Sequence, residues 1–296
     1  MKVFVTGSEG QLGYDIMREL SRSNHICIGA DLFEKTHNNY PYIQLDIIDP
    51  IAVNRIISSF NPDVVIHCAA WTEVDAAEEP NNLQIVKSIN TEGTRNIVNI
   101  CKKLNCKMIY ISTDYVFDGH GSEPWLPDCH QYHPLNIYGH SKLAGELIVA
   151  SMLHKYYILR VEWMYGINGK NFVKTIINIG NKYDEVKVVY DQIGTPTYTV
   201  DISKLIIDMA EKERYGYYHA ANEGGFISWY EFTSEIFRQT GITSKIVPVS
   251  TKEYGRSKAN RPLNSRFDKS KLQENGFKLL PTWSDALTRF LKEMGY

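Results

Sequence analysis

Several features that mark specialised classes of protein are missing from this sequence. No stretch approaches the roughly 18 consecutive apolar residues of a membrane-spanning helix, and no basic segment followed by a long apolar run marks the chain for export. The net charge is only -2, so the charge excess of dedicated nucleic-acid or anionic-membrane binders is absent. We therefore expect a cytoplasmic protein with neither nucleic acid nor a membrane as a partner.

Cysteine and histidine give no sign of a metal centre. The 5 cysteines are odd in number and include no Cys-x-x-Cys pair, so we expect reduced thiols rather than a disulfide framework. His120, His130 and His133 lie in or beside a polar stretch at 121–134 and lack the spacing of metal ligands. We assign no metal, and we expect this stretch to be a loop that covers the functional site.

The sequence does contain a regular alternation of strand-like and helix-like segments over residues 1–166. Short apolar runs predict strands at 3–5, 25–30, 42–47, 64–67, 108–111 and 156–161. Apolar residues at helical spacing predict helices around Leu12, Ile16 and Leu20, at 51–60, and over a long segment at 78–104. A strand that is apolar throughout, such as 64–67, is typical of a parallel sheet with helices on both faces. This pattern predicts an α/β fold.

A glycine-rich turn follows the first predicted strand. Its glycines have the spacing Gly-x-x-Gly-x-x-Gly, and the segment comprises Gly7, Gly10, Gln11, Leu12 and Gly13. Strand, glycine-rich turn and helix are the context of a dinucleotide fingerprint, in which the backbone approaches a pyrophosphate at the helix N-terminus. We therefore predict a Rossmann-like, doubly wound parallel sheet in residues 1–166, with this turn as part of the cofactor site.

Further candidates for the cofactor site follow the later strands. Asp31, about 18 residues past the last glycine, would accept hydrogen bonds from the adenosine ribose and repel a 2′-phosphate, which favours NADH over NADPH. A solvated loop aspartate is the alternative. Asp46 and Ile47 are placed to meet the adenine, and the small Ala69 and Ala70 would border the nicotinamide.

A tyrosine and a lysine with helical spacing form the candidate catalytic pair. Tyr138 and Lys142 would lie one turn apart on one face of a helix, where the lysine cation favours the phenolate form of the tyrosine. Such a tyrosine could protonate the alkoxide that forms when a ketone accepts hydride. Thr113, at the end of the fifth predicted strand, would reach the same oxygen, with Ser112 as the neighbouring alternative. Asn90 would either hold a backbone kink and a water or lie on a helix surface.

From residue 167 to 296 the strict alternation loosens. Short elements follow, with helices predicted at 172–182, 203–212, 228–241 and 284–294 and strands at 186–189 and 217–220. We expect a smaller mixed α/β part that binds the substrate, while elements from about 186–221 join the first domain.

The order of motifs along the chain resembles the dTDP-4-dehydrorhamnose reductases, a family of extended short-chain dehydrogenases/reductases. The resemblance rests on TGSEGQLG (6–13), AAWTEVDAAE (69–78), STDYVFDG (112–119), PLNIYGHSKLAGE (134–146), LRVEWMYG (159–166), NF (171–172), DQIGTPT (191–197) and RPLNS (261–265). It implies reduction of the C4 ketone of dTDP-4-dehydro-L-rhamnose by NADH or NADPH, giving dTDP-L-rhamnose for cell-surface polysaccharide.

The resemblance also implies roles for individual residues. Tyr138 would donate the proton, Thr113 would contact the ketone oxygen, and Lys142 would hold the nicotinamide ribose and lower the tyrosine pKa. The implied substrate contacts are Thr72 and Val74, Tyr115 and Trp163 beside the sugar, and Asn171, Gln192, Thr195 and Arg261 at the thymidine diphosphate end. A guanidinium offers bidentate donors to phosphate, which supports Arg261, although a surface arginine before a proline turn is the alternative.

The sequence departs from the family around the segment 124–128, where similar proteins carry an acidic residue near Pro127. Some members dimerise through a metal held by C-terminal glutamates; we place no such glutamates here and expect a monomer or homodimer.

Three other activities use the same fold. One is a nucleotide-sugar 4,6-dehydratase or 4-epimerase; a dehydratase of this kind would need a second carboxylate after Thr113-Asp114, where this chain has Tyr115. A reductase of another dTDP-4-keto-6-deoxyhexose, such as one giving a 6-deoxy-talose product, and a non-catalytic NAD(P)-binding regulatory subunit are the remaining alternatives.

Overall fold

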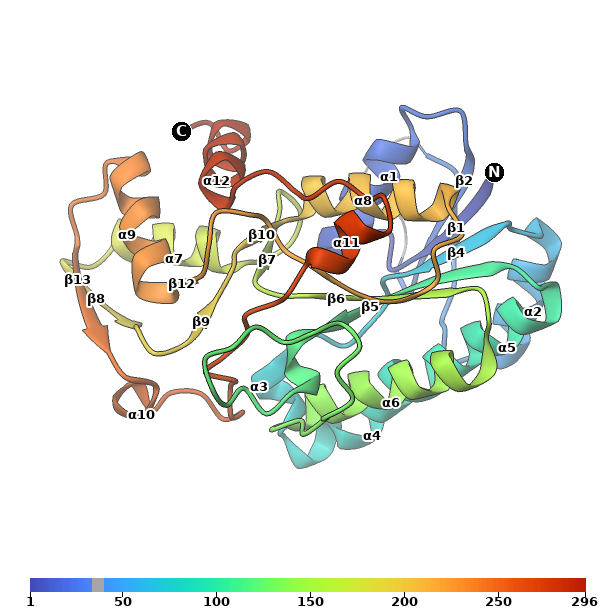
Figure 1. Cartoon of the computed structure of the whole chain (residues 1–296), viewed down its shortest axis with the longest axis horizontal. Helices are drawn as coiled ribbons and strands as arrows, with labels where there is room; N and C mark the ends of the chain where they lie inside the picture. Colours follow the sequence, from blue (N-terminus) through green and yellow to red (C-terminus); the bar gives the residue numbers. More distant parts are fainter. Residues whose placement is uncertain (34–39) are drawn as a thin grey trace.

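A parallel sheet forms the centre of the molecule, and the computed structural model describes residues 1–33 and 40–296 around it. The sheet has seven strands in the order β11-β6-β5-β4-β1-β2-β3 (Figure 1). Their bounds are β1 (Lys2–Thr6), β2 (Ile26–Asp31), β3 (Tyr42–Gln44), β4 (Val64–His67), β5 (Lys107–Thr113), β6 (Tyr156–Val161) and β11 (Gly216–Ala220). The strand order reverses between β1 and β4, which is where doubly wound sheets open a crevice for a ligand. The predicted Rossmann-like fold is confirmed.

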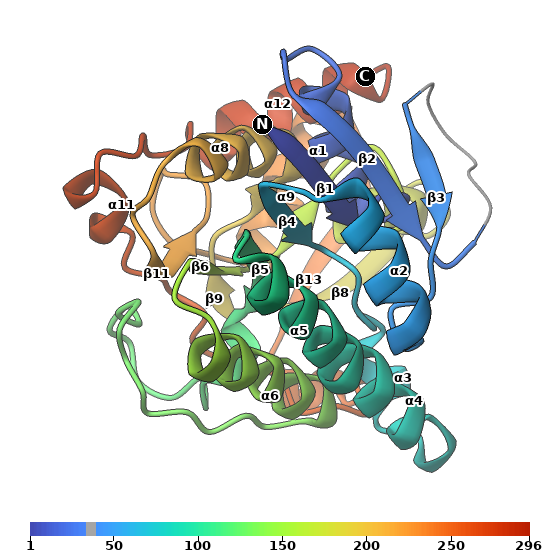
Figure 2. The same cartoon turned by 90° about the vertical axis from the view of Figure 1, so that its right-hand side faces the viewer.

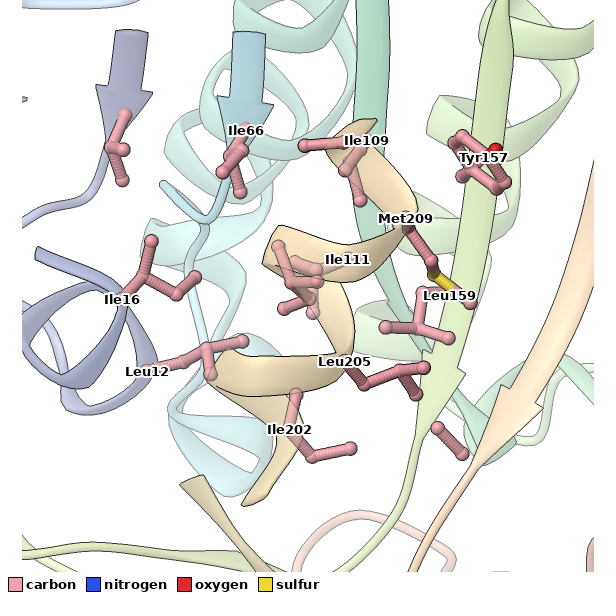
Figure 3. Packing of buried hydrophobic residues seen from close by; sticks show 14 of the residues in the cluster. Leu12, Ile16, Ile66, Ile109, Ile111, Tyr157, Leu159, Ile202, Leu205 and Met209 are labelled. Atoms are coloured by element: carbon pink, nitrogen blue, oxygen red, sulfur yellow. The ribbon is translucent and has the colours of Figure 1, made fainter. Parts of the chain in front are cut away.

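Helices cover both faces of this sheet, as the apolar strands require (Figure 2). One face carries α1 (Gln11–Leu20) and α8 (Thr199–Glu211), and the other carries α2 (Pro50–Phe60), α5 (Thr94–Leu104) and α6 (Ile137–Met152). Figure 3 shows the first of these cores, where Leu12 and Ile16 of α1 and Ile202 and Leu205 of α8 face the sheet. None of the helices in the described part of the chain has the length and apolar character needed to cross a bilayer.

A second, smaller body lies beside the carboxyl ends of the sheet strands (Figure 1). It contains α7 (Phe172–Gly180), α9 (Trp229–Thr240), α12 (Trp283–Glu293) and the parallel pair of β8 (Glu185–Val189) and β13 (Lys245–Val249) around its own apolar core. The other short elements are β7 (Met164–Tyr165), β9 (Ile193–Gly194), β10 (Thr197–Tyr198) and β12 (Ile227–Ser228). In addition, α10 (Thr251–Tyr254) packs beside β8 of the small body, and α11 (Ser270–Glu274) packs beside β11 of the large sheet. The segment 186–221 is divided between them, because β8 stays in the small body while α8 and β11 complete the large sheet.

Two elements differ from the sequence-based predictions. The strand predicted at 42–47 ends at Gln44, because the Asp46 carboxylate accepts a hydrogen bond from the Ile48 amide and turns the chain toward α2. The helix predicted at 78–104 is a composite whose middle turn is a π-helix at Ser88–Gly93. Its other parts are the 3₁₀ turn η1 (Pro80–Asn82), α4 (Leu83–Lys87) and α5. A π turn of this kind often marks a functional site.

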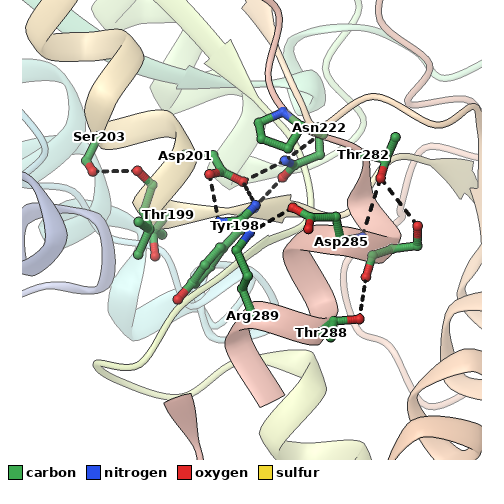
Figure 4. Close-up of polar contacts among 12 residues, drawn as sticks. Tyr198, Thr199, Asp201, Ser203, Asn222, Thr282, Asp285, Thr288 and Arg289 are labelled. Carbon is green, nitrogen blue, oxygen red and sulfur yellow. Dashed lines mark hydrogen bonds and ion pairs between the residues drawn. The ribbon is translucent and has the colours of Figure 1, made fainter. Parts of the chain in front are cut away.

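A polar network ties the large sheet to the small body (Figure 4). Arg289 of α12 donates to both carboxylate oxygens of Asp201 in α8, at 3.0 and 2.7 Å. Asn222 joins them by donating to Asp201 at 2.9 Å and accepting from the Tyr198 amide at 2.8 Å. Asp201 is buried, so its charge depends on these partners.

We expect Arg289→Met to destabilise the protein by about 1–3 kcal/mol, since it leaves a buried carboxylate with too few donors. Equilibrium unfolding in urea measures this change. Arg238→Met is the matched control: Arg238 pairs with Glu235 in the same small body but is largely exposed, so its loss should leave the free energy of unfolding almost unchanged. Equal losses in the two variants would contradict the role given to the Arg289 network.

Candidate active site

The predicted catalytic residues meet at the carboxyl edge of the sheet. Thr113 is the last residue of β5, and Tyr138 and Lys142 belong to the first turns of α6, which packs against β5. The register of β5 and β6 places Thr113 opposite Val161, so Glu162 and Trp163 emerge beside it. Ligands of open α/β sheets bind at this edge.

The glycine-rich turn has the shape that a dinucleotide requires. Gly7 has a φ of +69°, and a Cβ at Gly13 would overlap the Gly7 carbonyl oxygen, so the turn packs too tightly for side chains at these positions. The helix α1 begins at Gln11 with Gly10 as its N-cap and no side-chain cap, which leaves its first amides available to an anion. Gln11 reaches the other way, toward the Met164 carbonyl, and Leu12 lies in the core. These features fit the pyrophosphate of a nicotinamide dinucleotide.

The remaining cofactor candidates line the same edge. Asp31 ends β2 and accepts hydrogen bonds from the amides of Glu9 and Leu32, which fixes its carboxylate beside the glycine-rich turn. Ala69 and Ala70 follow β4, and a Cβ at Gly7 would lie 2.5 Å from the Ala69 nitrogen, so these loops are in contact. Asp46 and Ile47 form the turn after β3, with Ile47 buried.

The start of α6 is held by hydrogen bonds on two sides. Asn136 caps the helix by accepting from the Gly139 amide at 2.8 Å and donates to the Asn260 carbonyl at 2.8 Å. Asn90, in the π turn, is buried and not on a helix surface. It donates to the Ser141 hydroxyl at 2.8 Å and accepts from the Trp71 amide at 2.8 Å. The helix α6 is therefore fixed in position relative to the loop after β4.

The pKa of Tyr138 differs from the sequence-based expectation. It is raised rather than lowered, because burial disfavours the phenolate and the Asp114 carboxylate repels it, while a hydrogen bond with Thr113 acts in the opposite direction. Thr113 itself donates to Asp114 at 2.9 Å. The phenol therefore keeps its proton near neutral pH, which is the state that a proton donor needs.

Lys142 is almost completely buried beneath this tyrosine. Its ammonium donates to the Ile111 carbonyl at 2.7 Å and lies 4.1 Å from the centre of the Tyr110 ring. Burial lowers the pKa of Lys142 to about 7, partly opposed by the Glu146 carboxylate one turn further along α6. The charge on this lysine is therefore sensitive to pH near neutrality.

Aromatic residues surround the position where the substrate sugar is predicted. Tyr115 packs edge-on against Tyr138, with ring centroids 5.6 Å apart, and its hydroxyl accepts a hydrogen bond from Arg261 at 3.2 Å. Trp163 stacks on Trp229 of the small body at 3.7 Å and adopts a φ of +46°, which is unusual for a bulky side chain. Thr72 is exposed and Val74 half-buried in the loop and helix that follow β4.

The structure gives three predicted diphosphate ligands other partners. Asn171 caps α7 and donates to Gln11 and to the Gly166 carbonyl. The side-chain amide of Gln192 donates to the Thr251 hydroxyl. Thr195 is fully buried, and its backbone amide donates to the Glu162 carboxylate. The contacts of Asn171 with Gln11 and of Thr195 with Glu162 join the small body to the large one. A role for the three residues at the diphosphate stays a prediction.

Sequence reasoning missed two buried carboxyl groups at this edge. Asp114 accepts from Ser265 at 2.5 Å, and burial raises its pKa to about 6. Glu162 accepts from the Thr195 amide at 2.9 Å, and burial together with the Asp114 charge raises its pKa strongly. Glu162 directly follows the predicted strand 156–161, and Asp114 lies three residues past the predicted strand 108–111, so position near a strand end was the available signal.

A buried ion pair behind the site was also missed. Arg160 of β6 donates to both oxygens of Glu146 in α6, at 2.8 and 2.7 Å, and neither side chain has exposed surface. Arg160 also donates to the Pro127 carbonyl at 3.1 Å, which holds the loop 121–134 against the sheet. Coverage of the substrate by this loop stays a prediction. No group of three or more potential metal ligands occurs among the described residues.

Lys142 gives a testable dependence of stability on pH. Its pKa is lowered from 10.5 to about 7, so between these values the unfolded chain binds a proton that the folded chain does not. The contribution of this group to stability therefore rises with pH through that window, by at most about 1.4 kcal/mol per unit.

We expect Lys142→Met to be more stable than the wild type near pH 7, with an advantage that shrinks as the pH approaches 10. Urea unfolding at several pH values measures the difference. Lys155→Met, at an exposed amine, is the control and should show no such trend. A difference between Lys142→Met and the wild type that stays constant with pH would contradict the assignment.

Comparison with known proteins agrees with this geometry. The family model described as RmlD substrate binding domain matches residues 1–296. A spore coat polysaccharide biosynthesis protein of Bacillus subtilis, SpsK, is 35% identical over 292 residues, with 99% of this chain and 97% of that protein covered.

Two solved structures are similar over the whole chain. A dTDP-4-dehydrorhamnose reductase of Clostridium acetobutylicum is 37% identical with a TM-score of 0.92, covering 100% of both chains. A second, from Bacillus anthracis in complex with NADP, is 38% identical with a TM-score of 0.88 and covers 99% of both chains. The predicted resemblance is confirmed, and the chain belongs to the dTDP-4-dehydrorhamnose reductase family.

Proposed function

We propose that this protein reduces the C4 ketone of dTDP-4-dehydro-L-rhamnose to a hydroxyl, giving dTDP-L-rhamnose, in the synthesis of a cell-surface polysaccharide. The observation that carries the proposal is the meeting of Thr113, Tyr138 and Lys142 at the carboxyl edge of the sheet, in a chain that matches the reductase family from end to end. The similarity to a spore coat polysaccharide protein supports the pathway.

The chain's own residues account for the proton and for the position of the ketone. A nicotinamide cofactor, NADH or NADPH, supplies the hydride that reaches C4 of the sugar. Thr113 and Tyr138 hold the ketone oxygen, and as the carbon is reduced the Tyr138 hydroxyl gives its proton to that oxygen. The raised pKa of Tyr138 keeps this proton in place until the oxygen becomes strongly basic. Tyr138 then recovers a proton from water.

Lys142 and the aromatic side chains prepare this step. Lys142, fixed by the Ile111 carbonyl, lies one helical turn from Tyr138, where it can hold the nicotinamide ribose and stabilise the phenolate that remains after proton transfer. Tyr115 and Trp163 would form walls against the sugar. The protein acts as a monomer or homodimer.

The proposal is tested by mixing purified protein with NADH or NADPH and freshly generated dTDP-4-dehydro-L-rhamnose, then following absorbance at about 340 nm and identifying the sugar. We expect turnover to dTDP-L-rhamnose, and we expect Tyr138→Phe to lower kcat by roughly 10²–10⁴ while binding cofactor normally. Tyr183→Phe removes an exposed hydroxyl and is the matched control.

If the reduced sugar were a different one, such as a 6-deoxy-talose, the assignment of dTDP-L-rhamnose as the product would be wrong. Protein that binds cofactor but turns over no dTDP-hexulose would indicate a regulatory binding subunit instead.

Asp31 sets the cofactor preference in this proposal. Its carboxylate, held by the Glu9 and Leu32 amides, favours the free ribose hydroxyls of NADH. We expect Asp31→Asn, which keeps an acceptor oxygen but removes the charge, to raise the ratio of NADPH to NADH in kcat/KM by about tenfold. Asp208→Asn, at an exposed site on α8, serves as the control. An unchanged ratio would remove Asp31 from the cofactor site.

A further inference from the structure

The rim between the two bodies of the molecule carries an ion pair to which no role has been given. Asp75 lies in α3 (Val74–Ala77), after the loop that follows β4, and its carboxylate contacts Arg261 in the segment between α10 and α11. The two residues are 186 positions apart in the sequence, and the Asp75 oxygen lies 2.6 Å from the Arg261 terminal nitrogen. Their pairing fixes the orientation of the arginine.

Each nitrogen of the Arg261 guanidinium has one protein partner. Nε donates to the Ser257 hydroxyl at 3.2 Å, Nη1 to the Tyr115 hydroxyl at 3.2 Å, and Nη2 to Asp75. A guanidinium carries five N–H groups, so among the contacts of the described residues one N–H on each terminal nitrogen is left for a ligand. N–H groups that remain free on a guanidinium can donate to the oxygens of a phosphate.

The second oxygen of Asp75 organises the backbone around this arginine. It accepts from the amides of Lys258 and Ala259, both at 3.0 Å. The neighbouring Asn260 carbonyl accepts from Asn136, the cap of the catalytic helix. Asp75 thus connects the loop beside the cofactor turn to the segment that presents Arg261, next to Tyr115 and Tyr138.

Asp75 partly neutralises the positive charge of Arg261, but we expect its effect on the orientation of the arginine to be larger. The Asp75 side chain is 43% exposed, so water screens its attraction for the guanidinium, and an exposed pair of this kind contributes little to stability. However, a free arginine side chain loses conformational entropy when it binds a ligand, and this loss weakens binding by several fold. Asp75 holds Arg261 in one orientation before the ligand arrives, so this entropic cost is avoided on binding. Geometry therefore outweighs net charge at this position.

We propose that Asp75 is a positioning residue for the nucleoside diphosphate of the substrate, which acts by holding Arg261 with its two remaining N–H groups toward the phosphate oxygens. The proposal rests on the proposed function, because it takes a nucleotide sugar as the ligand. Asp75 itself does not contact the reacting atoms.

Asp75→Asn separates the two contacts of this side chain. An asparagine can keep its oxygen toward the two backbone amides, but its NH₂ then faces the arginine, where two donors cannot pair. We expect this variant to weaken binding of dTDP, measured by titration calorimetry, about three- to tenfold. The KM for the dTDP-sugar should rise by a similar factor, with kcat and the Kd for NADH unchanged.

A double-mutant cycle shows whether Asp75 acts through Arg261. Arg261→Gln should weaken dTDP binding roughly 10- to 100-fold, because it removes a charged donor. The variant with both substitutions should bind dTDP no more weakly than Arg261→Gln alone. Glu79→Gln is the matched control, since it breaks only the neighbouring ion pair with Lys258 and should leave dTDP binding as in the wild type.

Three results would overturn the proposal. These are wild-type binding of dTDP by Asp75→Asn, a further loss when that change is added to Arg261→Gln, or no binding of dTDP by the wild type. Because calorimetry with dTDP needs no turnover, a protein that binds dTDP with these ratios but reduces no ketone would reject the proposed reaction while retaining the role of Asp75.

Discussion

The buried ion pair between Glu146 and Arg160 is the constraint on which the active-site geometry depends. Neither charge has exposed surface, so each must be paired, and a helix position that separated them would leave an uncompensated charge in the interior. Tyr138, Lys142 and Glu146 follow one another at four-residue intervals along α6. Fixing Glu146 against β6 therefore fixes the face of the helix that carries Tyr138 and Lys142. The same guanidinium binds the Pro127 carbonyl and Tyr132, so the loop 121–134 shares this anchor.

The fold was largely predictable because parallel strands leave a strong local signal. Buried strands such as β4 appear in the sequence as short apolar runs. The glycine-rich turn is recognisable because a side chain at Gly7 or Gly13 would overlap neighbouring backbone atoms. The predicted element boundaries were wrong where side-chain hydrogen bonds change the backbone that the apolar pattern predicts. Asp46 ended β3 early through a local hydrogen bond, and the π turn around Asn90 depends on Trp71 and Ser141, which are distant in sequence. Apolar periodicity carries no information about such contacts.

In the candidate site, too, some features were predictable from local sequence and others depend on contacts between distant segments. Thr113, Tyr138 and Lys142 were selected by residue type and by position after a strand or on a helix face, and the structure brings these elements together. The direction of the Tyr138 pKa was wrong, because the sequence shows the nearby lysine but not the burial and the Asp114 charge that dominate. The pairing of Asp75 with Arg261 and of Glu162 with the Thr195 amide joins segments that only the complete fold brings into contact.

The backbone and the side chain of Trp163 make opposite contributions to stability. A tryptophan in the left-handed region costs on the order of 1–3 kcal/mol, and its ring is held there by the stack with Trp229. Glycine would relieve the backbone but would lose the stack with Trp229. Trp163 is thus a position at which the backbone and the side-chain packing favour different residues.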